Sequence, residues 1–167
     1  GKTLVMKYSR WKQQQPDMAL EKEMDLFKYF EEEHKYIEER LSELEENYES
    51  WSAERVFVRA TKMFDAITKH FEKQETFILA EIRDYPSMQA TIAECLKDRK
   101  SILDAIDDLV MDHIDSKEFR GNLGKLLKAV RKHITFSDEE LYKAIRANVP
   151  EKNLSALYDA VKEKMFA

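Results

Sequence analysis

The segment HFEKQETFILAEI, residues 70–82, is followed 63 residues later by a similar segment, HITFSDEELYKAI, residues 133–145. Each begins with a histidine on the apolar face of an amphipathic helical pattern, and each places polar residues four and five positions after it. Burying a polar side chain in an apolar stripe costs free energy. The occurrence of a histidine at the same position of both stripes therefore indicates that the two histidines have the same role.

The helices that precede these segments repeat as well. EHKYIEERLSEL, residues 33–44, aligns without gaps on DRKSILDAIDDL, residues 98–109, and this alignment sets Arg99 against His34. Because all four segments keep one register, we infer an internally duplicated helical hairpin.

The composition favours helices along the whole chain, which has 167 residues with only 3 Gly and 3 Pro. Ser52, Ser87 and Ser116 are the expected starts of the second, third and fourth helices. We therefore expect a single all-α domain over 1–167, an up-down-up-down four-helix bundle. Its expected parts are an arm at 1–16, a bundle at 17–148 with helices at about 17–48, 52–84, 87–111 and 116–148, and a short C-terminal helix at 150–165.

Charge and motif content narrow the expected function. The net charge is −5 with mixed surface charges, which disfavours nucleic acid as a partner, and no segment has the length of apolar sequence that a signal peptide or membrane span needs. The single Cys95 is typical of a cytoplasmic protein. The spacing GNLG at 121–124 lacks the rest of a phosphate-binding loop, and no nucleophile constellation is visible, so an enzyme is not favoured. A homodimer or a protein partner is left open.

Each of the four apolar stripes has one polar interruption: His34, His70, Arg99 and His133. Counted from the connecting turns at about 1.5 Å per residue, the four lie within roughly one helical turn of a common level. We therefore expect a polar layer inside the bundle, whose members bind one another or a metal ion. The run Glu31–Glu33 is expected on the solvated face of its helix.

Residues 26–145 resemble a hemerythrin-like (HHE) domain, a four-helix bundle that binds non-haem iron. His34 in EEEHKYI matches the lone histidine of the family's first helix, and His70 in HFEKQE matches the start of the second-helix motif. His133 and Asp138 in HITFSD match the HxxxxD form of the last helix. The resemblance implies that these four residues are metal ligands.

Two positions depart from the family pattern. Gln74 stands where a bridging glutamate is expected, and an amide cannot supply an anionic bridge. Arg99 stands where a ligand histidine is expected, and its permanent charge repels a metal ion and favours a carboxylate partner such as Glu75 or Asp138. Gln74, Arg99 and Ser137 thus read as replaced ligands, with Glu75 as a neighbour of the site.

Two interpretations follow from this damaged ligand set. In the first, the chain binds iron, as a mononuclear or partly occupied di-iron site, with a role in oxygen, nitric oxide or redox sensing or in iron handling, and a small diatomic molecule is its ligand. In the second, no metal binds, and the chain is an interaction or regulatory bundle. Its polar layer is then an Arg99–carboxylate network that fixes the register of the helices.

Overall fold

The computed structural model describes the backbone of residues 2–134 and 138–167, with side chains described from residue 21 onward except at 27 and 135–138. The elements are α1 (Lys2–Asn47), α2 (Ala53–Lys73), the π-helix η1 (Gln74–Leu79), α3 (Ala80–Ile82), the 3-10 turn η2 (Pro86–Met88), α4 (Gln89–Met111), α5 (Lys117–Lys132), α6 (Asp138–Asn148) and α7 (Glu151–Met165). The expected all-α fold is confirmed.

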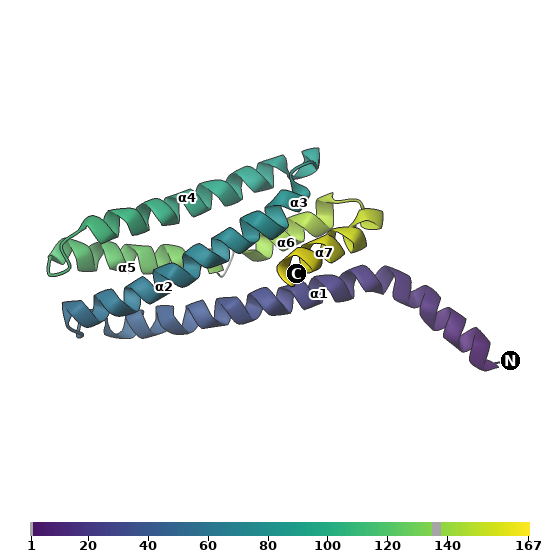
Figure 1. The fold of residues 1–167 in the computed structure, drawn as a ribbon, viewed down its shortest axis with the longest axis horizontal. Helices are drawn as coiled ribbons and strands as arrows, with labels where there is room; N and C mark the ends of the chain where they lie inside the picture. Colours follow the sequence, from purple (N-terminus) through teal and green to yellow (C-terminus); the bar gives the residue numbers. More distant parts are fainter. Residues whose placement is uncertain (1, 135–137) are drawn as a thin grey trace.

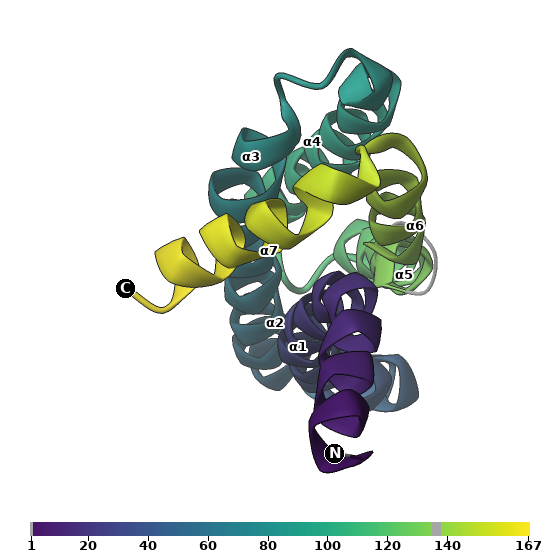
Figure 2. The ribbon, with the colours of Figure 1, turned by 90° about the vertical axis from the view of Figure 1, so that its right-hand side faces the viewer.

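The helices form four antiparallel columns (Figure 1). The first is α1, the second runs through α2, η1 and α3, the third is α4, and the fourth runs through α5 and α6. Contacts join α1 to α2 and to α5, and α4 to α2 and to α5, as in a bundle whose neighbouring helices alternate in direction. Figure 2 shows α7 lying obliquely across one end of the bundle, where it packs against α1.

Two hydrophobic clusters fill the bundle, and the polar layer separates them. Along α1, Phe30 belongs to one cluster and Ile37 to the other, with His34 between them. Along the second column, Phe71 and Ile78 likewise lie in different clusters, with Gln74 between them. The polar interruptions of the sequence therefore mark a boundary inside the core, as the expected common level requires.

Salt bridges tie α7 to α1 outside this layer. Lys22 Nζ lies 2.6 Å from an Asp159 carboxylate oxygen, and Lys162 Nζ lies 3.0 Å from a carboxylate oxygen of Asp25. Since these four side chains lie between 21% and 64% exposed, each pair contributes about 1 kcal/mol or less. The apolar face of α7 also buries Leu154, Leu157 and Val161, and each such side chain contributes about 1.5–3 kcal/mol when fully buried.

Two of the three predicted N-caps are confirmed. Ser52 Oγ accepts a hydrogen bond from the Arg55 backbone N–H, and Ser116 Oγ accepts one from the Phe119 N–H. The prediction for Ser87 is wrong, because Ser87 Oγ donates to the carbonyl of Asn148 and α4 begins after Met88. Pro86 starts a 3-10 turn that delays the α-helix.

The predicted helix bounds differ from the structure in three places. The first helix begins at Lys2 rather than at residue 17, because residues 2–15 contain no glycine or proline, and Pro16 removes one hydrogen bond without ending α1. This N-terminal part of α1 extends beyond the bundle (Figure 1). The second helix is interrupted by η1, and the fourth is divided, since α5 ends at Lys132 and residues 133–134 form a π-helical turn.

Among the described residues, no helix combines the length and the apolar character that crossing a membrane would require.

Candidate metal centre

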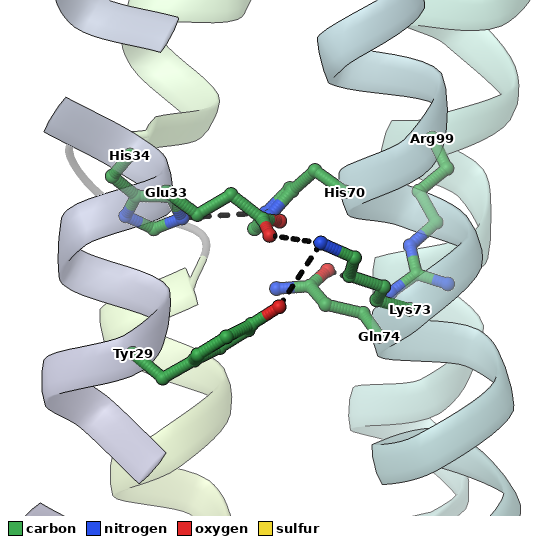
Figure 3. Close-up of polar contacts among 7 residues, drawn as sticks. All are labelled: Tyr29, Glu33, His34, His70, Lys73, Gln74 and Arg99. Atoms are coloured by element: carbon green, nitrogen blue, oxygen red, sulfur yellow. Dashed lines mark hydrogen bonds and ion pairs between the residues drawn. The ribbon is translucent and has the colours of Figure 1, made fainter. Parts of the chain in front are cut away.

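His34 of α1 and His70 of α2 face each other in the layer (Figure 3). Their Nε2 atoms are 3.3 Å apart, and the ring centroids are 4.8 Å apart. His70 is only 1% exposed, and its Nδ1 lies 2.6 Å from Oε1 of Glu33. Because the carboxylate accepts a hydrogen bond from Nδ1–H, the lone pair of a neutral His70 ring lies on Nε2 and points toward His34.

The second carboxylate oxygen of Glu33, Oε2, also accepts a hydrogen bond. Lys73 Nζ donates to Glu33 Oε2 at 2.7 Å and to the Tyr29 hydroxyl at 3.1 Å (Figure 3). Burial raises the pKa of Glu33, but the hydrogen bonds from His70 and Lys73 outweigh it, so this pKa lies below its ordinary value. Burial lowers the pKa of Lys73, but Glu33 and Tyr29 raise it more, so that pKa lies above its ordinary value. Both groups therefore remain charged at neutral pH.

The expectation that Glu33 lies on the solvated face is wrong, because its side chain is only 15% exposed. Glu33 is hard to recognise in the sequence because it ends an acidic run whose other two members, Glu31 and Glu32, are exposed. A signal was nevertheless present in the repeat, which aligns Glu33 with Asp98 just as it aligns His70 with His133.

The second half of the repeat contains the same dyad. His133 is 5% exposed, and its Nδ1 lies 2.5 Å from Oδ2 of Asp98 on α4. Its ring lies edge-on to Phe71 with the centroids 4.9 Å apart, and 6.0 Å from the ring of His70. In each half, then, a carboxylate one residue before the inner polar position holds Nδ1 of the histidine from the following helix.

Arg99, which the repeat aligns with His34, does not contact the histidine of its own half as His34 does, and binds Gln74 instead. It is 3% exposed, and its Nη2 donates to Oε1 of Gln74 at 2.7 Å, while Nη1 lies 3.9 Å from a carboxylate oxygen of Glu75 (Figure 3 shows Arg99 beside Gln74). Of the two predicted carboxylate partners, Glu75 lies within ion-pair distance but beyond hydrogen-bond range, and its 66% exposure lets solvent screen the interaction. The side chains of Asp138 and Ser137 lie outside the described residues.

Both halves leave the α-helical path beside the layer. Gln74 begins η1, and His133 lies in a π-helical turn. A π turn inserts one residue into the helix and shifts the register of the side chains that follow it, and such turns occur often at functional sites. Sequence periodicity assumes one constant register and therefore did not predict either turn.

The described donors fit one metal ion better than two. Two imidazole nitrogens that each lie about 2.1 Å from one ion are themselves about 3 Å apart, which is close to the separation of the His34 and His70 Nε2 atoms. A carboxylate on Nδ1 is the usual support of a metal-binding histidine. Among the side chains that the structure describes, however, no group of three or more His, Cys, Asp or Glu is arranged to hold a metal. The described side chains therefore supply two facing imidazoles, and the side chain of Asp138 lies outside them.

The layer has a route to solvent at His34. This side chain lines a surface pocket of about 550 Å³ between α1 and α5, together with Glu38, Arg131 and Ile134. An ion or a small molecule can therefore approach His34 from outside, whereas His70 behind it is buried.

A protein-family model described as the hemerythrin HHE cation binding domain matches residues 25–145. Comparison with curated proteins and with solved structures gave no match. The matched range contains both halves of the repeat and every member of the polar layer, so it confirms the resemblance that the sequence motifs indicate.

Proposed function

This chain belongs to the family of hemerythrin HHE cation-binding domains, and we propose that it binds one divalent metal ion, iron foremost, in its polar layer. His34, His70, His133 and Asp138 are the proposed ligands. The observation that carries the proposal is the pair of Nε2 atoms 3.3 Å apart, with Glu33 fixing the ring of His70 from behind. Imidazole and carboxylate ligands suit iron and zinc alike, and the family favours iron.

One ion rather than two is proposed because of Arg99. A di-iron centre would need ligands on α4, and α4 presents a guanidinium to the layer instead of an imidazole. A permanent buried cation opposes a second metal charge close by. Gln74, which accepts the hydrogen bond from Arg99, contributes no negative charge to offset it.

We further propose a role in sensing a small diatomic molecule or in handling iron. An iron ion held by two or three imidazoles and one carboxylate keeps open coordination positions, and these are what such a molecule binds. The pocket beside His34 supplies the route to the layer.

The test is metal retention after purification without chelators. The protein should retain up to one equivalent of iron, and His34→Ala should lose it while His113→Ala retains it. His113 is a matched control because its side chain is 81% exposed. Absence of metal above background, together with a melting temperature that added iron does not change, would rule the proposal out.

A second candidate is a metal-free regulatory bundle, and the hydrogen bond from Arg99 to Gln74 favours it. This bond and the two carboxylate–histidine dyads pair buried polar groups within the layer, so the layer can exist without an ion. Under this alternative, Arg99→Met should destabilise the protein as strongly with iron as without it. Under the metal proposal, bound iron should raise the melting temperature of the wild type and of this variant.

A further inference from the structure

The face of α5 beside α1 carries a concentration of positive charge that the polar layer does not explain. Six of the 16 residues of α5 are Lys or Arg and only Glu118 is acidic, in a chain whose net charge is −5. Lysines near a helix C-terminus complement the helix dipole, but this accounts only for the last turn. Of the basic residues before that turn, Lys125 and Lys128 lie next to a cavity.

A pocket of about 700 Å³ lies between the end of α1 and α5. Its apolar wall includes Tyr48, Gly121, Gly124 and Leu127, of which Leu127 is 1% exposed. This volume lies within the range of about 300–1,000 Å³ that is usual for small-molecule sites.

The two glycines of this wall have different explanations. A Cβ at Gly124 would lie 3.0 Å from the Tyr48 hydroxyl oxygen, so the close approach of Tyr48 to α5 requires glycine there. A Cβ at Gly121 would have nothing within 4 Å, so packing does not require glycine at that position. Glycine is a poor residue for a helix interior, and one without a packing reason points to a need for open space.

Three lysines border the same pocket. Lys125, Lys128 and Lys132 follow one another at helical spacing, all are exposed, and none forms an ion pair within the described part of the chain. Arg131 differs, because its guanidinium is held by Glu45 at 3.0 Å and by Ser42 at 3.1 Å. Glu45 also lines the pocket, and its carboxylate is paired with Arg131. The pocket therefore combines an apolar wall with a row of ammonium groups and one paired carboxylate.

We propose that this pocket binds a small organic anion that has an apolar part. Its carboxylate, sulfonate or phosphate group would contact Lys125, Lys128 and Lys132, and its apolar part would lie against Tyr48, Leu127 and the open surface at Gly121. The proposal is independent of metal binding, because none of the proposed metal ligands lines this pocket, although Arg131 lines both this pocket and the one that contains His34.

The test uses anilinonaphthalene sulfonate as a fluorescent probe on the full chain, with decanoate as a competitor and inorganic phosphate as a competitor that has no apolar part. We expect saturable binding that decanoate displaces and phosphate does not. Lys125→Glu with Lys128→Glu should weaken binding by at least about tenfold, since attraction is replaced by repulsion. Lys97→Glu with Lys100→Glu, on the exposed face of α4, should change it by less than about twofold.

The variant Gly121→Leu distinguishes binding inside the pocket from binding to a charged surface. The added side chain would occupy the open space, and helix propensity favours the substitution, so the variant should fold with an unchanged or higher melting temperature. We expect it to weaken probe binding by about tenfold, the loss that follows when the apolar contact is blocked. Unchanged binding by Gly121→Leu, or equal losses in the lysine pair and in its control on α4, would overturn the proposal. Anionic lipid vesicles that bind the wild type and Gly121→Leu equally would also overturn it, since they would assign the lysines to a membrane surface.

Discussion

The two halves of the duplicated layer share a dyad and differ in the residue beside it. In the first half, Glu33 holds His70, and the neighbouring His34 meets the other nitrogen of that ring. In the second half, Asp98 holds His133, but the neighbouring residue is Arg99, which turns to Gln74 on the second column. A single difference at one aligned position therefore gives one half a second imidazole and the other a fixed positive charge.

The supporting residues differ as well. Lys73 and Tyr29 extend the hydrogen-bonded chain from Glu33, whose side chain is 15% exposed. The side chain of Asp98 is 37% exposed. The carboxylate of the first half is thus the more shielded from solvent, which agrees with the proposed role of that half as the main metal-binding half.

The largest expected effect comes from the two dyad histidines. His70→Ala should abolish metal retention, because it removes the one ring that faces both other imidazoles, whereas His133→Ala should weaken affinity by roughly 10–100-fold. Metal content after anaerobic reconstitution with iron measures both, with circular dichroism to establish that each variant folds. Equal loss in the two variants would show that the halves contribute alike.

Making the second half resemble the first should change the metal count. Arg99→His combined with Gln74→Glu replaces the cation by an imidazole and supplies a carboxylate, so the count should rise from one equivalent toward two. Arg99→Met is the matched control, because it removes the charge without adding a ligand. A count of one in the double variant would show that Arg99 does not occupy the place of a second ion.

A smaller difference is expected between the two carboxylates. Glu33→Gln should weaken iron affinity by roughly 10–100-fold, since the amide supports the His70 ring without its charge. Asp98→Asn should have a smaller effect, because Asp98 supports the more distant ring of His133. Competition with a coloured chelator measures both affinities, and Glu32→Gln, on the exposed neighbour of Glu33, should match the wild type.

The smallest effect is expected at Lys73. Its side chain is 37% exposed, so Lys73→Met should lower iron affinity by less than about fivefold, equivalent to about 1 kcal/mol. Lys69→Met, one helical turn away on the exposed surface, provides the baseline in the same assay. A loss as large as that of Glu33→Gln would make Lys73 essential to the orientation of Glu33 rather than a modest support.

Helical periodicity predicted the members of the layer, and it did so because one polar residue in an apolar stripe is unambiguous. His34, His70, Arg99 and His133 were counted to a common level, and the structure places His34 and His133 beside the ring of His70 and buries Arg99. The ligand assignment itself, including Asp138, stays a prediction.

Periodicity did not find the residues that support the layer. Glu33 follows two exposed glutamates, and Asp98 adjoins Lys97, so composition alone assigns both to the surface. Only the comparison of the two repeats indicates their role, because it aligns Glu33 with Asp98, one residue before His34 and Arg99 respectively. The π turns at Gln74 and His133 escaped prediction because a periodic pattern assumes one constant helical register.

The central claim is that the layer accommodates one metal ion, because the guanidinium of Arg99 provides the positive charge that a second ion would otherwise bring. Anaerobic titration of metal-stripped protein with iron(II), followed by isothermal calorimetry, counts the ions directly. We predict one equivalent for the wild type. A count of two, or no binding at all, would contradict the account.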